Sequence, residues 1–209
     1  QERQNNLRYG NALCKGEIGG SGLELQERVE LFKNELDLIH NEIVREFVIA
    51  CLEIAPDYVF MDCPSSSTGK FHPLEELSSD GTIIHTKKVF SLAYELSLGL
   101  DCAEYRDEVC AAALLHDLMK QGPERSGHTV QDHPQLMANK ITEVYNEKFK
   151  DRMDTTSAQI IYYGVFYHYG PWTLDQFKKP IKDFSPMELA VFIADFIASK
   201  RFVHVSYRK

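Results

Sequence analysis

Two side chains that can do chemistry stand next to each other at the end of an apolar run: His116 and Asp117, in the stretch AALLHDLMKQG. Burying either of them without a partner is unfavourable, so both need a partner at the same place. Four more residues of these types fall where we expect helices to face inward, namely His85, His133, His168 and Asp195. Imidazole nitrogen and carboxylate oxygen are ligands of iron, manganese, zinc and cobalt. Six such groups exceed the ligands of one tetrahedral zinc ion and suit two divalent metal ions that share a carboxylate.

The elements that must position these residues read as helices almost throughout. Apolar residues recur at spacings of three and four positions, which predicts an all-α protein. The expected helices cover residues 24–55, 82–98 and 104–120, one that starts near 133, then 157–168, and a last one that starts at 186. His85 falls on the apolar stripe of its helix, and Asp195 lies inside the apolar run AVFIADFIA. Ser185 and Glu188 have the spacing of a capping box at the start of the last helix.

Each of these residues also has an ordinary interpretation. A single histidine on an apolar stripe is more often a hydrogen-bonded core residue than a metal ligand. An HD dipeptide arises easily by chance. The prediction of a metal site therefore depends on the ordered set of six residues and not on any one of them.

The segment between the first two predicted helices is rich in Pro, Ser and Gly and contains SSSTGK. Its end resembles that of a P-loop, but Pro64 stands where that motif needs Gly and Phe71 stands where it needs Ser or Thr, so we exclude a P-loop. The segment is either a solvated connection or a loop that brings Ser66 and Lys70 to a phosphate at the metal site. His128, in a later loop, is a further candidate for contact with the substrate.

The ordered residues resemble the HD-domain metal-dependent phosphohydrolases over residues 70–202. This resemblance implies an HD-domain-like helical bundle, here with an N-terminal helical extension. The ligands that match the mononuclear branch of that family are His85, His116, Asp117 and Asp195, and the dinuclear branch adds two histidines that His133 and His168 match in order. The resemblance thus implies that Asp117 bridges two ions of iron, manganese, zinc or cobalt. HDLMK also resembles the H-D-x-x-K motif of the dinuclear branch, which implies a catalytic Lys120 beside Asp117.

The activity that the resemblance implies is hydrolysis of a nucleotide or related small phosphate ester, by attack of metal-activated hydroxide on phosphorus. Lys120 would then stabilise negative charge on the phosphoryl oxygens. Two other functions stay open, because some proteins that resemble this pattern are mixed-valence di-iron oxygenases and a nucleotide-binding sensor without turnover would use the same scaffold. Lys120 favours hydrolysis over oxygenation, and the complete ligand set disfavours the sensor. We assign Lys200 and Arg201 to the cationic end of the last helix.

Composition limits the partners and the compartment. The chain has 23 basic and 31 acidic residues and a net charge of −8, which disfavours long nucleic acid and leaves a small phosphorylated substrate. Five cysteines without a C-x-x-C pair indicate reduced thiols and a cytoplasmic protein. No apolar run reaches the roughly 20 residues of a membrane-spanning helix, so we expect no membrane partner.

The length of 209 residues suits a single domain. We predict that this domain covers residues 23–209, with the metal-binding core within 70–202, and that residues 1–22 form a poorly ordered or tag-like N-terminus. The helix predicted over 24–55 is longer than most helices of globular proteins. It would either pack into the core or pair two chains as a homodimer.

Overall fold

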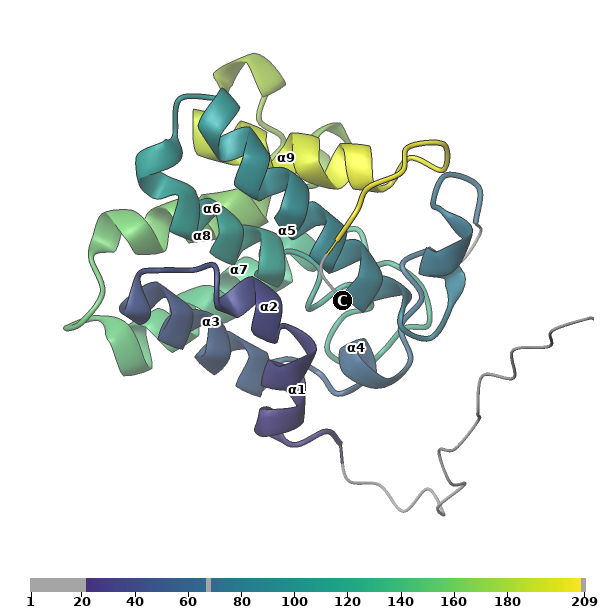
Figure 1. Ribbon diagram of the computed structural model, residues 1–209, viewed down its shortest axis with the longest axis horizontal. Helices are drawn as coiled ribbons and strands as arrows, with labels where there is room; N and C mark the ends of the chain where they lie inside the picture. Colours follow the sequence, from purple (N-terminus) through teal and green to yellow (C-terminus); the bar gives the residue numbers. More distant parts are fainter. Residues whose placement is uncertain (1–21, 67–68, 208–209) are drawn as a thin grey trace, which may run out of the picture.

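A computed structural model describes residues 22–66 and 69–207, and all regular elements in these ranges are helical (Figure 1). The predicted all-α class is therefore confirmed. The α-helices are α1 (Leu25–Leu31), α2 (Lys33–Leu36), α3 (Glu42–Ile54), α4 (Tyr58–Met61), α5 (Gly81–Gly99), α6 (Arg106–Leu115), α7 (His133–Val144), α8 (Thr155–Tyr167) and α9 (Pro186–Ala198). Short helical turns include η1 (Leu74–Leu77) before α5 and η4 (Gly170–Trp172) after α8.

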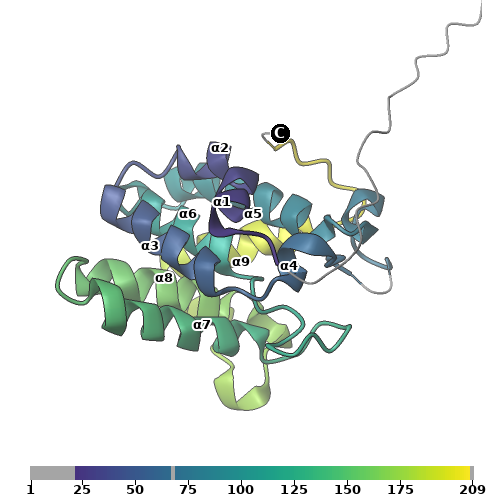
Figure 2. The same cartoon turned by 90° about the horizontal axis from the view of Figure 1, so that it is seen from below.

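Helix α6 lies at the centre of the bundle. All of its residues from Glu108 to Leu115 are buried, and it packs against α3, α5, α8 and α9. Helices α7 and α8 run side by side in Figure 2, and α5 packs against α9. A Cβ atom at Gly164 would lie 2.8 Å from Cβ of Ala112, so glycine is what allows α8 to approach α6 this closely. This close packing brings the C-terminal ends of α6 and α8 together.

The prediction of a single helix over residues 24–55 is wrong, because the structure divides this segment into α1, α2 and α3. The side chain of Asn41 accepts hydrogen bonds from the backbone N–H groups of Ile43 (3.0 Å) and Val44 (3.3 Å). Asparagine is a favoured N-cap residue, and here it starts a new helix after the turn over residues 37–41. The apolar spacing continues across that turn, which is why periodicity alone missed the break.

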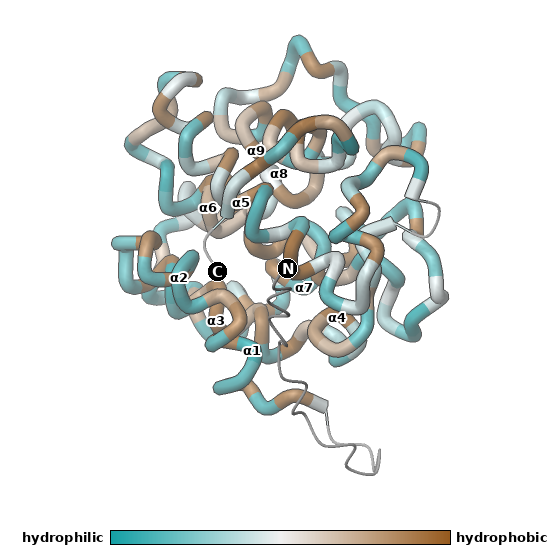
Figure 3. Tube along the Cα trace, turned by 45° about the vertical axis from the view of Figure 1, so that its right-hand side comes forward, coloured by the Kyte–Doolittle hydropathy of each residue, from teal (hydrophilic) through white to brown (hydrophobic). Residues whose placement is uncertain are grey.

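The three N-terminal helices complete the hydrophobic core. Phe32 and Leu36 are buried at the α1–α2 end, and Phe47, Val48 and Cys51 are buried along α3. Figure 3 shows α3 largely hydrophobic with hydrophilic residues among them, and its buried residues recur at spacings of three and four, as expected for a helix buried on one side. Helix α3 packs against α6 and α7, so this segment has the core role that was one of its two predicted roles.

The third predicted helix ends earlier than expected, at Leu115 instead of Lys120. Beyond that point the backbone forms turns, in which Lys120 N–H donates to the carbonyl of Asp117, three residues back (3.0 Å). The hydroxyl of Tyr58 donates to the carbonyl of Gly122 (2.9 Å) and holds the end of this turn. The HD pair therefore lies where α6 stops and not within a continuous helix.

The start of α9 has the capping box that the sequence predicts. The capping box is confirmed, because Ser185 N–H donates to Glu188 Oε2 (3.0 Å) and Glu188 N–H donates to Ser185 Oγ (3.3 Å).

Within the part of the chain that the structure describes, no helix combines the length and apolar character that crossing a membrane requires. The predicted N-terminal segment lies outside the described residues except for residue 22.

Candidate metal centre

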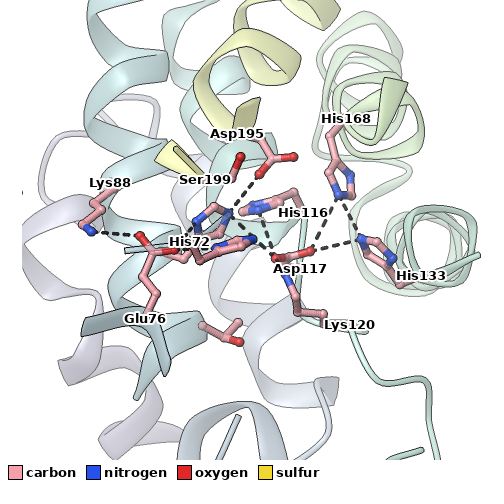
Figure 4. A network of polar contacts seen from close by, with 12 residues as sticks. His72, Glu76, Lys88, His116, Asp117, Lys120, His133, His168, Asp195 and Ser199 are labelled. Carbon is pink, nitrogen blue, oxygen red and sulfur yellow. Dashed lines mark hydrogen bonds and ion pairs between the residues drawn. The ribbon is translucent and has the colours of Figure 1, made fainter. Parts of the chain in front are cut away.

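The structure brings the six predicted ligands together at one end of the bundle, and Figure 4 labels all of them except His85. They come from five helices or their ends, with His85 on α5, His116 and Asp117 at the end of α6, His133 at the first residue of α7, His168 directly after α8 and Asp195 on α9. Five of the six are almost completely buried, and the side chain of Asp195 is 19% exposed. Residues distant in the sequence thus form one compact group of nitrogen and oxygen atoms.

The carboxylate of Asp117 lies in the middle of this group. Its Oδ2 atom is 3.4 Å from Nε2 of His116 and 4.0 Å from Nε2 of His85. Its Oδ1 atom is 3.1 Å from Nε2 of His133 and 3.7 Å from Nε2 of His168. Each oxygen therefore faces a different pair of imidazoles, which is the arrangement that a carboxylate bridging two cations requires.

Three of the histidines are oriented by the same backbone device, a hydrogen bond from Nδ1 to the carbonyl three residues earlier. The acceptors are Ala113 O for His116 (2.8 Å), Val130 O for His133 (2.7 Å) and Val165 O for His168 (2.7 Å). Ala113 and Val165 lie in the last turns of α6 and α8, where carbonyl groups lack the usual partner four residues later, although Val165 O also accepts from His168 N–H (3.4 Å). Because a carbonyl only accepts, Nδ1 carries the proton and Nε2 presents a lone pair.

These lone pairs are arranged as metal ions need them. Nε2 of His116 is buried and has no hydrogen-bond partner among the described residues. Nε2 of His133 and Nε2 of His168 are 3.1 Å apart, and with Nδ1 donating to a carbonyl, the neutral form of either ring has no proton at Nε2 to donate. Lone pairs that face one another or a carboxylate repel, and a bound cation removes that repulsion. The donor set therefore fits divalent metal ions, and ligand histidines in proteins commonly donate their other N–H group in this way.

His85 is held differently from the other three histidines, because a carboxylate lies on each side of its ring. Nε2 is 2.9 Å from Oδ1 of Asp195, and Nδ1 is 3.2 Å from Oε2 of Glu76. Burial alone lowers the pKa of His85, but the hydrogen bonds to Asp195 and Glu76 outweigh burial and raise that pKa to about 9. The position between His85 and Asp195 thus favours a positive charge, which a metal ion can supply in place of a proton.

Glu76 is a site residue that sequence reasoning missed. It is completely buried on η1, and it also accepts hydrogen bonds from Nδ1 of His72 (2.8 Å) and Nζ of Lys88 (2.8 Å). Burial raises the pKa of Glu76, but the hydrogen bonds from His72 and His85 outweigh it and hold that pKa below its usual range. His72, Glu76 and His85 lie as close as metal ligands do, but both imidazoles already donate Nδ1–H to this carboxylate. The group therefore supports His85 and is not a third metal site.

The charges of the centre suit metal binding as well. Burial raises the pKa of Asp117, but Lys120 and His116 lower it well below its usual range. Burial likewise raises the pKa of Asp195, and the hydrogen bond from His85 lowers it below its usual range. Burial lowers the pKa of His133, which keeps this ring neutral. Both carboxylates are thus ionised while His133 is in the form that binds metals.

A cavity of about 270 Å³ opens onto the centre. Asp117, His133, His168 and Asp195 line its floor, together with Lys120, whose Nζ contacts Oδ2 of Asp117. Burial lowers the pKa of Lys120, but Asp117 raises it above its usual value, so the ammonium group stays charged. The cavity also has a lining that no motif indicated, which includes His72, Trp172, Phe196, Ser199 and Lys200.

None of the three residues predicted to contact the substrate lines this cavity. Ser66 and His128 line a separate hollow, to which Gln121 also contributes. Lys70 does not line the metal cavity either, but its neighbour Phe71 does, and Nζ of Lys70 lies 5.1 Å from the centroid of the Phe71 ring. The sequence of a loop has no periodicity that indicates how the loop folds back, and in the structure Ser66 and His128 line the other hollow.

Comparison with known proteins agrees with this geometry. A family profile described as HD domain matches residues 82–199, which is more than half of the chain. The matched range runs from the first turn of α5 to the end of α9 and contains all six residues of the centre. No curated protein and no solved structure gives a significant match.

Proposed function

The chain belongs to the HD domain family, and on this basis we propose that it is a metal-dependent phosphohydrolase that acts on a nucleotide or related small phosphate ester. Members of this family are typically phosphohydrolases of this kind. The observation that carries the proposal is the position of Asp117, whose two oxygens face the Nε2 atoms of two different pairs of imidazoles. That arrangement supports a centre with two metal ions and not with one.

The residues divide into two sets of ligands. His85, His116, Asp195 and Oδ2 of Asp117 would hold one ion, and His133, His168 and Oδ1 of Asp117 would hold the other. Bound divalent ions lower the pKa of water and polarise a phosphoryl oxygen, which is the chemistry that phosphate-ester hydrolysis needs. The four imidazoles are already oriented by their Nδ1 hydrogen bonds, so the centre needs little rearrangement to receive the ions.

The charge of the centre favours an anionic substrate. Asp117 and Asp195 supply two negative charges, which two divalent ions exceed, and Lys120 adds a further positive charge at the cavity. Lys120 lies next to the carboxylate shared by both sets of ligands, where its ammonium group can stabilise charge on the phosphoryl oxygens. The cavity volume of about 270 Å³ is near the lower end of small-molecule sites, roughly 300 Å³, and favours a small ester over a polymer.

Metal analysis combined with a phosphate-release screen tests the proposal. The purified protein is analysed for bound metal and then incubated with nucleotides and sugar phosphates in the presence of Mn, Fe, Co or Zn. We expect Asp117→Ala and His116→Ala to lose bound metal and phosphate release together. Asp175→Ala is a matched control, because Asp175 is exposed and its carboxylate bonds only to Lys178 among the described residues, and this variant should retain both properties.

Three outcomes would contradict the proposal. Full metal content and full phosphate release in both Asp117→Ala and His116→Ala would remove the centre from the reaction. Iron-dependent oxygen uptake without phosphate release would indicate an oxygenase on the same scaffold. Tight nucleotide binding without turnover under every metal would indicate a sensor.

A further inference from the structure

We propose that the aromatic side chains at the mouth of the metal cavity form a subsite for a flat ring, the base of a nucleoside phosphate. Trp172, Phe196 and Phe71 all line the cavity that contains the metal-binding residues, and they are 48%, 39% and 59% exposed. Large apolar side chains that stay exposed around a cavity are typical of a ligand-binding site. The inference rests on the proposed function, because it concerns the part of that substrate that lies beyond the phosphate.

Trp172 and Phe196 stack on each other. Their ring planes are only 11° apart and their centroids are separated by 5.8 Å, which is an offset parallel stack. Tyr169 continues the aromatic surface inward, since its ring lies 6.3 Å from that of Trp172 and 4.9 Å from that of His133. These aromatic side chains therefore lead from the mouth of the cavity to a residue of the metal centre, and a ligand can contact both at once.

The backbone of the turn that carries Trp172 is held in place. Gly170 has a positive φ of 52°, and a Cβ atom there would lie 2.4 Å from the ring of Phe192, so the turn η4 packs directly against α9. The amide of Gln131 donates to the carbonyl of Trp172 (3.3 Å). A ring presented on a fixed turn loses little conformational entropy when a ligand stacks on it.

Positive charge lies beside the aromatic surface. Nζ of Lys200 is 3.6 Å from the centroid of Phe196 and lines the same cavity, and Lys120 lies deeper, at the metal centre. The same pairing of ring and cation recurs where Lys70 lies over Phe71. Aromatic rings combined with lysines are what proteins use to bind nucleotides, because the rings stack on the base and the cations attract the phosphate. A sugar phosphate would use the charges but not the aromatic rings.

The subsite contains its own reporter, because Trp172 is the single tryptophan of the chain. Zinc-loaded protein is titrated with the common ribonucleoside 5′-monophosphates and, separately, with ribose 5-phosphate, which has the same sugar and phosphate but no base. We expect saturable quenching of tryptophan fluorescence by the nucleotides and much weaker quenching by ribose 5-phosphate. The Trp172→Phe variant should give no signal, which identifies its source.

Calorimetric titration of variants measures the contribution of the ring. Trp172→Ala should weaken nucleotide binding by about 5- to 150-fold, the effect of losing a base–aromatic stack, and should leave ribose 5-phosphate binding unchanged. Trp172→Phe should retain most of the affinity, because a flat ring remains. Phe202→Ala is the matched control, since Phe202 is 95% exposed and does not line the cavity.

Equal binding of ribose 5-phosphate and nucleotides, or equal weakening of both ligands in Trp172→Ala, would overturn the subsite. Failure of the subsite and failure of the proposed function give different results. Phosphate release that does not depend on Trp172 would keep the proposed function and remove the subsite. Selective nucleotide binding through Trp172 without phosphate release from any ester would keep the subsite and remove the proposed function.

Discussion

Replacing Glu76 with glutamine tests whether the buried network behind His85 sets the affinity of the metal centre. Oε2 of Glu76 accepts hydrogen bonds from Nδ1 of His85 (3.2 Å) and of His72 (2.8 Å), and Oε1 accepts from Nζ of Lys88 (2.8 Å). Glutamine keeps one acceptor oxygen for the imidazoles, but it turns an NH₂ group toward the lysine and loses the negative charge. His85 then becomes a weaker electron donor to a metal ion.

Loss of such a supporting carboxylate lowers metal affinity by about 10- to 100-fold, which corresponds to about 1.4–2.7 kcal/mol. No described contact joins Glu76 to His133 or His168, so only one of the two ions should be weakened. Competition with a chelator measures the affinity of each ion. Lys88 keeps its contact with Glu75 (2.5 Å), so we expect a folded protein that is less stable by about 1–3 kcal/mol in thermal unfolding.

Glu75→Gln is the matched control for this variant. Glu75 lies next to Glu76 and contacts the same Lys88, but it does not contact His85, and its side chain is half exposed. The two variants therefore make the same change of charge at almost the same place. Wild-type affinity for both ions in folded Glu76→Gln, or equal losses of affinity in the two variants, would refute the role assigned to Glu76.

Three further predictions address the other parts of the site. His133→Ala should reduce the bound metal from two ions to one in elemental analysis, and two retained ions would contradict the division of ligands. Because the pKa of His85 is raised to about 9, a proton competes with the metal ion at Nε2 below that pH. The apparent affinity for the metal ion should therefore rise about tenfold per pH unit up to about pH 9 and then level off. A flat pH profile in the chelator assay would contradict this. Tyr58→Phe removes a hydroxyl that donates to Gly122 O (2.9 Å) and accepts from Gln121 N–H (3.0 Å), and it should cost about 1–3 kcal/mol in urea unfolding without changing the metal content.

Helical periodicity predicts the inward positions of two of the six central residues, because it fixes which side chains of a helix share a face. The other four stand at helix ends, and the ordered set of residue types indicated them. His85 lies on an apolar stripe, and Asp195 lies within an apolar run, so both had to be buried and both had to find a partner there. The packing that joins them depends on α5 meeting α9, and an all-α bundle of this family supplies that contact. Burial and chemistry therefore led to the same residues.

The surroundings of the centre could not be predicted in the same way. Glu76 and His72 lie outside the long helices, where no periodicity says which way a side chain points. Trp172 stands on a short turn, and its position depends on the contact between Gly170 and Phe192, which are distant in the sequence. Such contacts arise only when separate segments fold against each other.

The hydrogen-bond acceptors that orient the four histidines differ in how a mutation can alter them during evolution. Three rings donate to main-chain carbonyl groups, which every amino acid supplies, whereas His85 donates to a side chain. A point mutation at an acceptor position cannot remove a carbonyl, so the half of the centre around His133 and His168 is robust to mutation in its supports. A mutation at Glu76, in contrast, removes the carboxylate to which His85 donates. Divergence in metal preference between relatives should therefore begin at the His85 half, and that half is the one that directed evolution can tune.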